Sequence, residues 1–273
     1  MTFIHPTAAN GFSQADAYAK LRPTYPQAVL DQLESLLLVN NNNNNKDIPM
    51  VDLAAGTGLG TKLLVEQGHY TNISAIEPVD TMREKLITLF PQVQTIKGTS
   101  WNIPLPSKSQ QVVFIFQAFH WFADIKSLEE IHRILKPEGY LILVWNLESK
   151  ERSQWVRKLR DLYEQYEGDA PQYRQQKWKT IFKEPKVNQL FDLPLKYKQT
   201  TNDMYCTKET VITRIMKTRS HIKMLSQKEQ NEVKEQIKSI LDDSDNGFNL
   251  NVDGYVHYPH DTDIFWTQRK SLL

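Results

Sequence analysis

Short apolar runs recur along the first half of the chain, and they are separated by segments whose apolar residues fall three and four positions apart. The runs predict strands over 48–53, 73–76, 93–96, 111–116 and 140–145. The intervening segments predict helices over 26–39, 57–67, 79–90 and 124–135. Strands that are apolar on both sides are typical of a sheet covered on two faces. The pattern therefore predicts an α/β fold with a doubly wound, mostly parallel sheet.

The pattern changes after residue 147, where longer amphipathic segments dominate. Helices are predicted over 153–167, 173–182, 208–218 and 227–241, and extended segments over 187–201, 249–257 and 263–269. We interpret the extended segments as closing strands of the same sheet and the helices as insertions over its ligand face. We therefore expect a single domain over 1–273, with a core over 12–146 and the insertions in 147–273. A separate second domain is the less favoured interpretation.

A run of six asparagines, residues 40–45, interrupts the first half of the chain. It carries no apolar side chain, so it is predicted to be a surface loop between ordered elements.

Composition excludes several functional classes. The chain has 273 residues, with 33 Lys and Arg against 32 Asp and Glu, so its net charge gives no general case for nucleic-acid binding. A single cysteine, Cys206, excludes an internal disulfide and a cysteine zinc site. The pair His257 and His260 is a weak hint of a metal site, and a turn is the favoured interpretation. With no apolar stretch near 20 residues, we expect a cytoplasmic protein without a membrane partner.

The segment from Val51 to Thr61, VDLAAGTGLGT, carries the clearest chemical signal. A buried strand ends at the acidic Asp52, a turn follows at Gly56 and Gly58, and a helix then begins. Glycines allow backbone to approach a ligand closely, and the start of the helix offers free N–H groups. In an open α/β sheet this turn lies at the carboxyl edge, where ligands bind.

A second acidic residue, Glu77, ends the next strand nineteen residues after Gly58. A carboxylate there can accept both hydroxyls of a ribose, a feature that is shared with NAD-binding folds. Two features disfavour a pyridine nucleotide. The third glycine of G-x-G-x-x-G is replaced by Thr61, and Asp52 would repel a pyrophosphate. An amino-acid ammonium would instead be attracted to that acid.

At this point the sequence resembles the class I S-adenosylmethionine-dependent methyltransferases, whose fold is Rossmann-like. The resemblance is carried by Asp52–Gly58, by Ala75–Pro78 with Met82, and by Leu135–Tyr140. Within that superfamily the chain is similar to the small-molecule enzymes of the trans-aconitate methyltransferase type. The matching residues there are Phe12, Tyr18–Pro26 (YAKLRPTYP), Gln117–Phe122 (QAFHWF), Thr218–Ser220, Tyr258, Phe265 and Trp266. The resemblance covers about residues 12–270.

The resemblance implies a cofactor site for S-adenosyl-L-methionine. Gly56 and Gly58 would hold its methionine part and Glu77 its ribose, while Pro78 or Met82 would flank the adenine. Tyr18 and Arg22 would reach the methionine carboxylate. Asp52, Ala54 and Gln117 complete the candidate cofactor-binding set. The chain departs from the family at Thr99, where many relatives place an Asp near the adenine amine.

His120 is the best candidate for a base or for a residue that orients the acceptor, because it follows the fourth predicted strand at the same edge. Its neighbour Trp121 would wall a dry pocket. Both residues could instead belong to the core. A base near neutral pKa helps if the acceptor is a hydroxyl or amine, and none is needed for a carboxylate.

We therefore expect an enzyme that methylates a small organic acceptor at oxygen, a carboxylate or a hydroxyl. The expected partners are this acceptor and no nucleic acid, with a monomer or homodimer as the assembly. Two alternatives are an NAD(P)-dependent oxidoreductase and a non-catalytic protein that binds S-adenosylmethionine.

Overall fold

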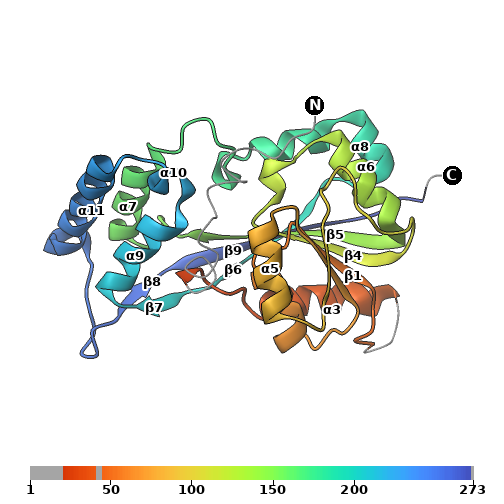
Figure 1. Ribbon diagram of the computed structural model, residues 1–273, viewed down its shortest axis with the longest axis horizontal. Helices are drawn as coiled ribbons and strands as arrows, with labels where there is room; N and C mark the ends of the chain where they lie inside the picture. The colour runs from red at the N-terminus through yellow and green to blue at the C-terminus, as the bar shows by residue number, and fades with distance from the viewer. Residues whose placement is uncertain (1–20, 41–44, 272–273) are drawn as a thin grey trace.

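The computed structural model describes residues 21–40 and 45–271, and its centre is a seven-stranded sheet with the order β3-β2-β1-β4-β5-β9-β6 (Figure 1). The strands are β1 (Met50–Leu53), β2 (Ile73–Ile76), β3 (Gln94–Ile96), β4 (Gln110–Phe116), β5 (Leu135–Glu148), β6 (Lys196–Thr201) and β9 (His260–Gln268). The first five strands pair in parallel, and β9 is antiparallel to both β5 and β6. The predicted doubly wound, mostly parallel sheet is confirmed.

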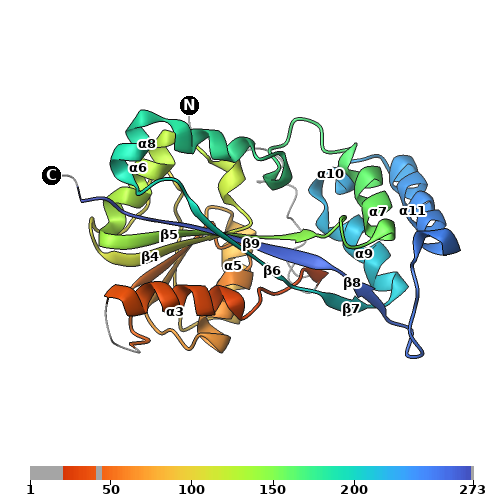
Figure 2. The same cartoon turned by 180° about the vertical axis from the view of Figure 1, so that it is seen from behind.

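Helices cover both faces of the sheet, as Figures 1 and 2 show from opposite sides. One face packs against α3 (Ala28–Asn40), α4 (Leu59–Lys62), the π-helical turn Leu63–Gln67 and α5 (Asp80–Leu89). The other packs against α6 (Ile125–Ile134), α8 (Pro185–Leu190) and the 3-10 segment Lys177–Lys183. Successive strand residues such as Val113 and Phe114 enter opposite cores, because side chains alternate across a strand. This explains why the strands are apolar on both sides.

A third hydrophobic core lies beyond the carboxyl end of β5, at the left of Figure 1. It is built by α7 (Gln154–Glu164), α9 (Lys208–Thr218), α10 (Ser220–Lys223), α11 (Gln227–Asp242) and a two-stranded sheet of β7 (Met204–Cys206) and β8 (Val256–Tyr258). We call these elements the helical lobe. Both α7 and α11 begin at a serine, Ser153 and Ser226, whose hydroxyl accepts a backbone N–H of the first turn.

Two of the predicted extended segments differ from the structure. Residues 187–201 were expected to be extended throughout, but α8 occupies 185–190 and only β6 is a strand. Pro185 fits the first helical turn, and Val187 and Leu190 bury the same helix face, three positions apart.

Of the segment 249–257, only β8 forms a strand, and it pairs with β7 rather than with the main sheet. The side-chain oxygen of Asn251 accepts the N–H groups of Asp253 and Tyr255 at 3.0 and 2.9 Å. Such bonds stabilise a turn in place of a strand. Residues 137–139 lie within β5, near a register shift at Gln110/Val112.

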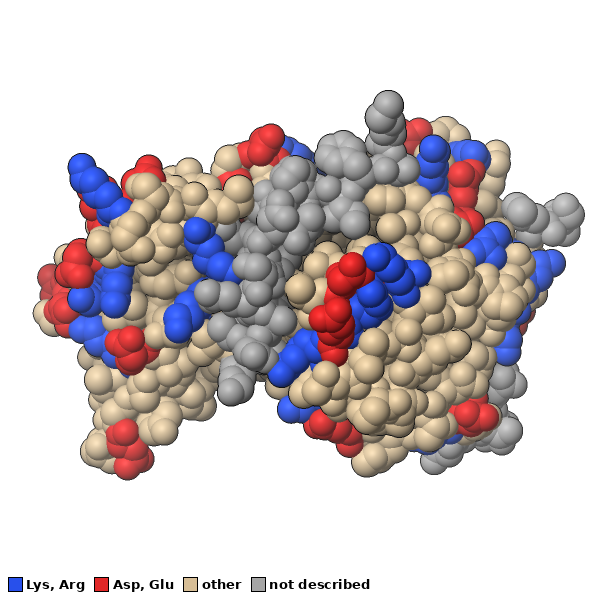
Figure 3. All heavy atoms as spheres, in the orientation of Figure 1, with Lys and Arg blue, Asp and Glu red and all other residues tan. Residues whose placement is uncertain are grey.

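On the face drawn in Figure 3, basic and acidic side chains are interspersed rather than gathered by sign.

Within residues 21–40 and 45–271, no helix combines the length and apolar character needed to cross a membrane.

Candidate active site

The loop after β1 bends sharply at the carboxyl edge of the sheet. Ala54, Gly56 and Gly58 all have positive φ, at 60°, 58° and 89°. This left-handed conformation is available to glycine without strain, which explains the Gly-x-Gly pattern. A Cβ on Gly60 would lie 2.1 Å from the ring of Phe116, so the first turn of α4 needs a glycine to approach β4. The loop backbone thereby forms the floor of a pocket.

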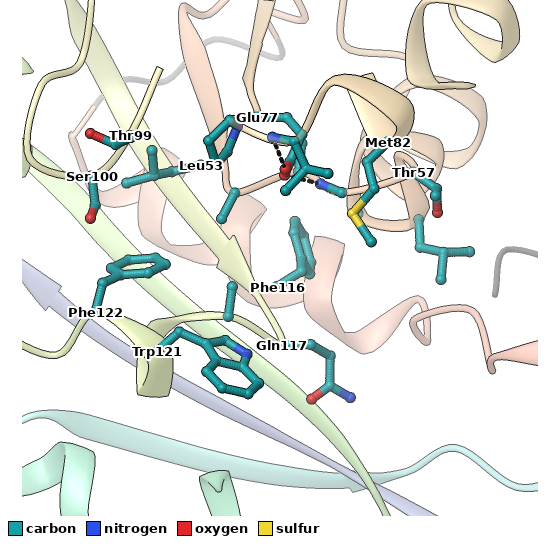
Figure 4. Close-up of a pocket in the computed structure, with 18 of the residues that line it drawn as sticks. Leu53, Thr57, Glu77, Met82, Thr99, Ser100, Phe116, Gln117, Trp121 and Phe122 are labelled. Carbon is teal, nitrogen blue, oxygen red and sulfur yellow. Dashed lines mark hydrogen bonds between the residues drawn. The ribbon is translucent and has the colours of Figure 1, made fainter. Parts of the chain in front are cut away.

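Glu77 follows β2 and is held by two backbone donors of its surroundings. The N–H of Gly56 donates to one carboxylate oxygen and the N–H of Val79 to the other, both at 2.8 Å (Figure 4). Burial raises the pKa of Glu77, and these two hydrogen bonds oppose that change. Each oxygen keeps a further lone pair, so the carboxylate can still accept hydroxyl groups from a ligand.

Around Glu77 lies a pocket, which we call the strand-edge pocket. Leu53, Pro78, Val79, Met82 and Phe116 supply apolar walls, and Thr99 to Trp101 supply one end. In Figure 4, Gln117 and Trp121 lie on the side opposite Glu77. The pocket is therefore apolar in most of its wall, with a few fixed polar groups, as small-molecule sites generally are.

Asp52 is fully buried beneath the loop and is not part of the pocket wall. Its Oδ2 accepts the hydroxyl of Thr61 at 2.7 Å, while within the described residues Oδ1 has no hydrogen-bond partner. Burial raises the pKa of Asp52 to about 7. An unpartnered buried carboxylate oxygen is costly, and a cationic group of a ligand would relieve that cost.

A second, polar opening adjoins the first, and we call it the polar cleft. It shares Arg22, Gln117, Trp121 and Asn146 with the strand-edge pocket. Its remaining lining comes from His120, Leu147, Tyr163, Glu164, Glu167, Gln172, Tyr173, Arg174, Thr218, Arg219 and His221. The two openings are thus continuous, one apolar against the sheet edge and one polar against the helical lobe.

The shared residues Gln117 and Asn146 are fixed by hydrogen bonds. Gln117 has φ 58°, and its side-chain amide donates to the carbonyl of Asn146 at 2.7 Å. The Asn146 amide donates to the carbonyl of Thr24 at 3.1 Å and accepts the hydroxyl of Thr262 at 2.5 Å. The junction between the two openings is therefore held by β4, β5, β9 and the segment before α3.

His120 lies in the 3-10 turn Phe119–Trp121 after β4 and lines the polar cleft. The indole N–H of Trp145 donates to its Nδ1 at 3.1 Å. Burial, with the nearby positive charge of Arg22, lowers the pKa of His120 to about 3. The imidazole is therefore neutral at physiological pH, and its accepting nitrogen is already engaged.

A buried ion-pair network closes the far end of the polar cleft. Glu148, at the end of β5, pairs with Arg219 and lies 3.3 Å from Arg214, and it accepts the hydroxyl of Tyr163 at 3.2 Å. The two guanidinium groups hold the pKa of Glu148 well below its usual range despite its burial. The network joins β5 to α7 and α9, and it fixes Arg219 at the cleft.

The structure brings together most residues expected from the sequence. Those lining the strand-edge pocket are Arg22, Ala54, Gly56, Glu77, Pro78, Met82, Thr99, Gln117 and Trp121. Asp52 and Gly58 lie behind it, His120 lies in the polar cleft, and Tyr18 lies outside the described residues. Within the described part of the chain, no group of three His, Cys, Asp or Glu side chains is placed to hold a metal ion.

The sequence did not single out Glu148, Tyr163, Glu167, Tyr173, Arg174 and His221, which line the polar cleft or support it. They come from segments separated by up to 73 positions, and no local motif joins them. Tyr163 could be noticed only as part of the apolar face of a predicted helix, which gave no reason to separate it from the core.

Part of the chain is similar in sequence to known methyltransferases. Residues 51–143 match the family model described as a methyltransferase domain. The chain is 33% identical over 165 residues to an uncharacterized methyltransferase-like protein of Schizosaccharomyces pombe, covering 60% of this chain and 62% of that one. It is 35% identical over 150 residues to an uncharacterized methyltransferase of Mycobacterium bovis, covering 55% and 57%. The chain thus spans about three fifths of the curated relatives it matches.

Among solved structures, a protein of Anaeromyxobacter dehalogenans described as a candidate type II methyltransferase has a TM-score of 0.65. It is 17% identical and covers 92% of this chain and 98% of that chain, which shows a shared fold. Residues 51–143 therefore match a methyltransferase domain in sequence, and the chain shares the fold of a protein described as a methyltransferase, which agrees with the resemblance that implies S-adenosylmethionine as the methyl donor.

The residues present fit that cofactor. Glu77 has lone pairs available for a ribose, the apolar walls at Val79 and Met82 suit a purine, and the unpartnered Oδ1 of Asp52 suits an ammonium group. When bound, the sulfonium supplies the electrophilic methyl group, so the protein contributes position and a water-poor pocket.

Proposed function

We propose that the protein transfers a methyl group from S-adenosyl-L-methionine to a small organic acceptor. The observation that carries the proposal is the pair of continuous openings. One holds a carboxylate fixed by two backbone N–H groups for a ribose, and the other is polar and joined to it at Gln117, Trp121 and Asn146. A donor and an acceptor molecule can thus meet at one junction.

In this proposal the chain acts by binding and orientation. Glu77 binds the ribose hydroxyls. The negative charge of Asp52 attracts the ammonium group at the amino-acid end of the cofactor. Gln117 and Trp121 lie between the two openings, where they exclude water from the reacting atoms. Holding two reactants in line can supply about 7–11 kcal/mol of the barrier reduction.

We further propose that the acceptor bears a carboxylate or hydroxyl oxygen and binds in the polar cleft, as in the trans-aconitate methyltransferase type that the sequence resembles. The support is that three guanidinium groups, of Arg22, Arg174 and Arg219, line the cleft, where Arg174 pairs with Glu164 and Glu167 and Arg219 pairs with Glu148. Guanidinium groups pair with oxygen anions in a planar, two-point geometry.

The two alternatives are tested in one titration. Calorimetry with S-adenosylhomocysteine and with NAD⁺ as probes should show binding of the first only. Binding of NAD⁺ alone would favour an oxidoreductase. An assay for transfer of labelled methyl groups to components of a metabolite extract would then separate an enzyme from a non-catalytic protein. The non-catalytic protein would bind the cofactor without turnover.

A variant pair makes the binding test specific to the site. Glu77→Ala removes charge-assisted hydrogen bonds worth about 1.5–3 kcal/mol, so affinity for S-adenosylhomocysteine should fall roughly 10- to 150-fold. Asp80→Ala is the matched control, because this acid is three residues away with a side chain 57% exposed. Wild-type affinity in Glu77→Ala, measured by calorimetry, would contradict the assignment.

A further inference from the structure

The indole of Trp145 is fully buried near the end of β5, and aromatic neighbours hold it in place. Its ring lies 4.5 Å from Tyr173 at an interplanar angle of 18°, and 4.5 Å from Trp178 at 32°. Phe265 packs edge-on at 5.9 Å. The indole is therefore confined on several sides, and its N–H direction is fixed with it.

These neighbours are themselves anchored by hydrogen bonds. The hydroxyl of Tyr173 donates to Asp263 at 2.5 Å, and the indole N–H of Trp178 donates to the carbonyl of Tyr173 at 3.2 Å. Asp263 also accepts the hydroxyl of Tyr197 at 2.6 Å. The aromatic cluster is thus fixed to β6 and β9, so Trp145 has little freedom to turn away from His120.

The donor properties of an indole determine the state of its partner. An indole N–H can only donate, so Nδ1 of His120, at 3.1 Å, must accept through its lone pair. A neutral imidazole that accepts at Nδ1 carries its proton on Nε2. The hydrogen bond therefore selects one of the two neutral tautomers.

We propose that Trp145 is a positioning residue that locks His120 as the neutral Nε2–H tautomer, so that His120 offers the acceptor a hydrogen-bond donor and not a base. This inference rests on the proposed function and deepens it, because His120 lines the polar cleft beside Trp121. It chooses between the two roles that the sequence left open for His120. Burial and the positive charge of Arg22 lower the pKa of this imidazole to about 3, and a lowered pKa also favours the neutral ring.

The proposal has a consequence for the reaction. The bond from methyl carbon to sulfur breaks with its electron pair remaining on sulfur, and a lone pair of the acceptor forms the new bond. No proton reaches His120, so a carboxylate oxygen can react directly, whereas a hydroxyl acceptor would have to give its proton to another group. The charged or titratable groups that line the cleft around His120 are Arg22, Glu164, Glu167, Arg174, Arg219, His221 and the phenols Tyr163 and Tyr173.

Nitrogen-15 NMR of the histidine rings tests the proposal on the full chain, with S-adenosylhomocysteine present as the probe and without it. The chain has seven histidines, and loss of one signal set in His120→Asn assigns the ring. We expect Nδ1 to give the unprotonated signal and Nε2 the protonated one from pH 5 to 9. Titration of wild-type His120 near pH 6.5, or a proton on Nδ1, would overturn the proposal.

Two tryptophan variants separate the lock from packing. Trp145→Phe should give a mixture of tautomers and raise the pKa of His120, because the donor to Nδ1 is removed. Trp178→Phe is the matched control, because it removes an indole from the same cluster whose N–H bonds elsewhere, and it should leave the His120 tautomer unchanged. The same tautomer in Trp145→Phe as in wild type would overturn the role of Trp145.

If Trp145→Phe does not fold, benzothienylalanine at position 145 keeps the shape of the ring and lacks the N–H. It should give the same mixture of tautomers, and an unchanged tautomer would again overturn the role of Trp145. These readouts need no turnover. A protein that shows the lock but neither binds S-adenosylhomocysteine nor transfers methyl groups would sink the proposed function and leave the tautomer assignment standing.

Discussion

The strand-edge pocket and the polar cleft share four residues, yet they hold their polar groups by different means. In the first, backbone N–H groups of a short loop fix the carboxylate of Glu77. In the second, side chains fix one another, as Glu148 does with Arg219 and Tyr163. Backbone donors depend on local conformation and tolerate sequence change around them. A side-chain network depends on every member, because removal of one leaves a buried charge unpaired.

Substitution of Glu148 is expected to have the largest effect on stability. Glu148→Ala leaves Arg219 and Arg214 without their carboxylate in a buried place, which should lower the free energy of unfolding by about 3–5 kcal/mol. Urea unfolding followed by tryptophan fluorescence measures it. Glu151→Ala, with a side chain 76% exposed, is the control and should change little. Equal losses in both variants would remove the contrast between the two regions.

A smaller effect is expected where backbone approach builds the strand-edge pocket. Gly60→Ala places a Cβ 2.1 Å from Phe116, and this overpacking should cost about 1–3 kcal/mol and weaken binding of S-adenosylhomocysteine. Gly168→Ala is the matched control, because its φ of 59° is left-handed and no atom lies within 4 Å. It should cost about 1–2 kcal/mol of strain and leave binding intact. Calorimetry and urea unfolding of both variants check this pair, and unchanged binding in Gly60→Ala would refute the steric argument.

A change of pH is expected to act on the two regions with opposite sign. The pKa of Asp52 is raised by burial to about 7, so it lowers stability increasingly as pH rises from about 4 to 7. Burial lowers the pKa of His120, His221 and His260 to about 3, so stability around them is lost as pH falls below 6.5. Because three histidines oppose one aspartate, global stability should fall on acidification from pH 6.5 to 5.

Hydrogen exchange resolved by peptide, corrected for intrinsic exchange rates, would separate the two contributions. On acidification of the cofactor-free protein, protection should rise around β1 and fall in the helical lobe. Asp52→Asn should abolish the first change and leave the second. If protection rises in both regions, or falls in both, the two regions do not respond to pH with opposite sign.

The comparison also explains which parts of the molecule could be predicted from the sequence. The strands β1, β2 and β4 are short apolar runs, and the loop from Ala54 to Gly58 needs glycine for its own conformation, so local patterns were sufficient. The position of Glu77 followed because parallel strands end at a common edge. Local residues thus determine the strand-edge pocket.

The polar cleft could not be predicted in the same way. Glu148 and Arg219 lie far apart in the sequence, and neither is marked out by a local chemical motif. The state of His120 is set by Trp145, which the sequence indicated only as the last residue of a predicted strand. Tertiary contacts, and not local periodicity, determine both. The same holds for β8, where the turn at Asn251 replaced an expected longer strand.

The strand β5 has a consequence for engineering. It runs without interruption from the sheet core at Leu135 to Glu148, and the full length from Tyr140 to Glu148 is paired with β9. The helical lobe is attached through that same strand, by Glu148 and by the bond from Arg160 to its carbonyl at 2.9 Å. A chimera that exchanges the lobe to change acceptor choice therefore has to transplant the outer halves of β5 and β9 together with it. A crossover at the start of α7 would exchange Arg214 and Arg219 but leave Glu148, the carboxylate that both contact, in the original chain.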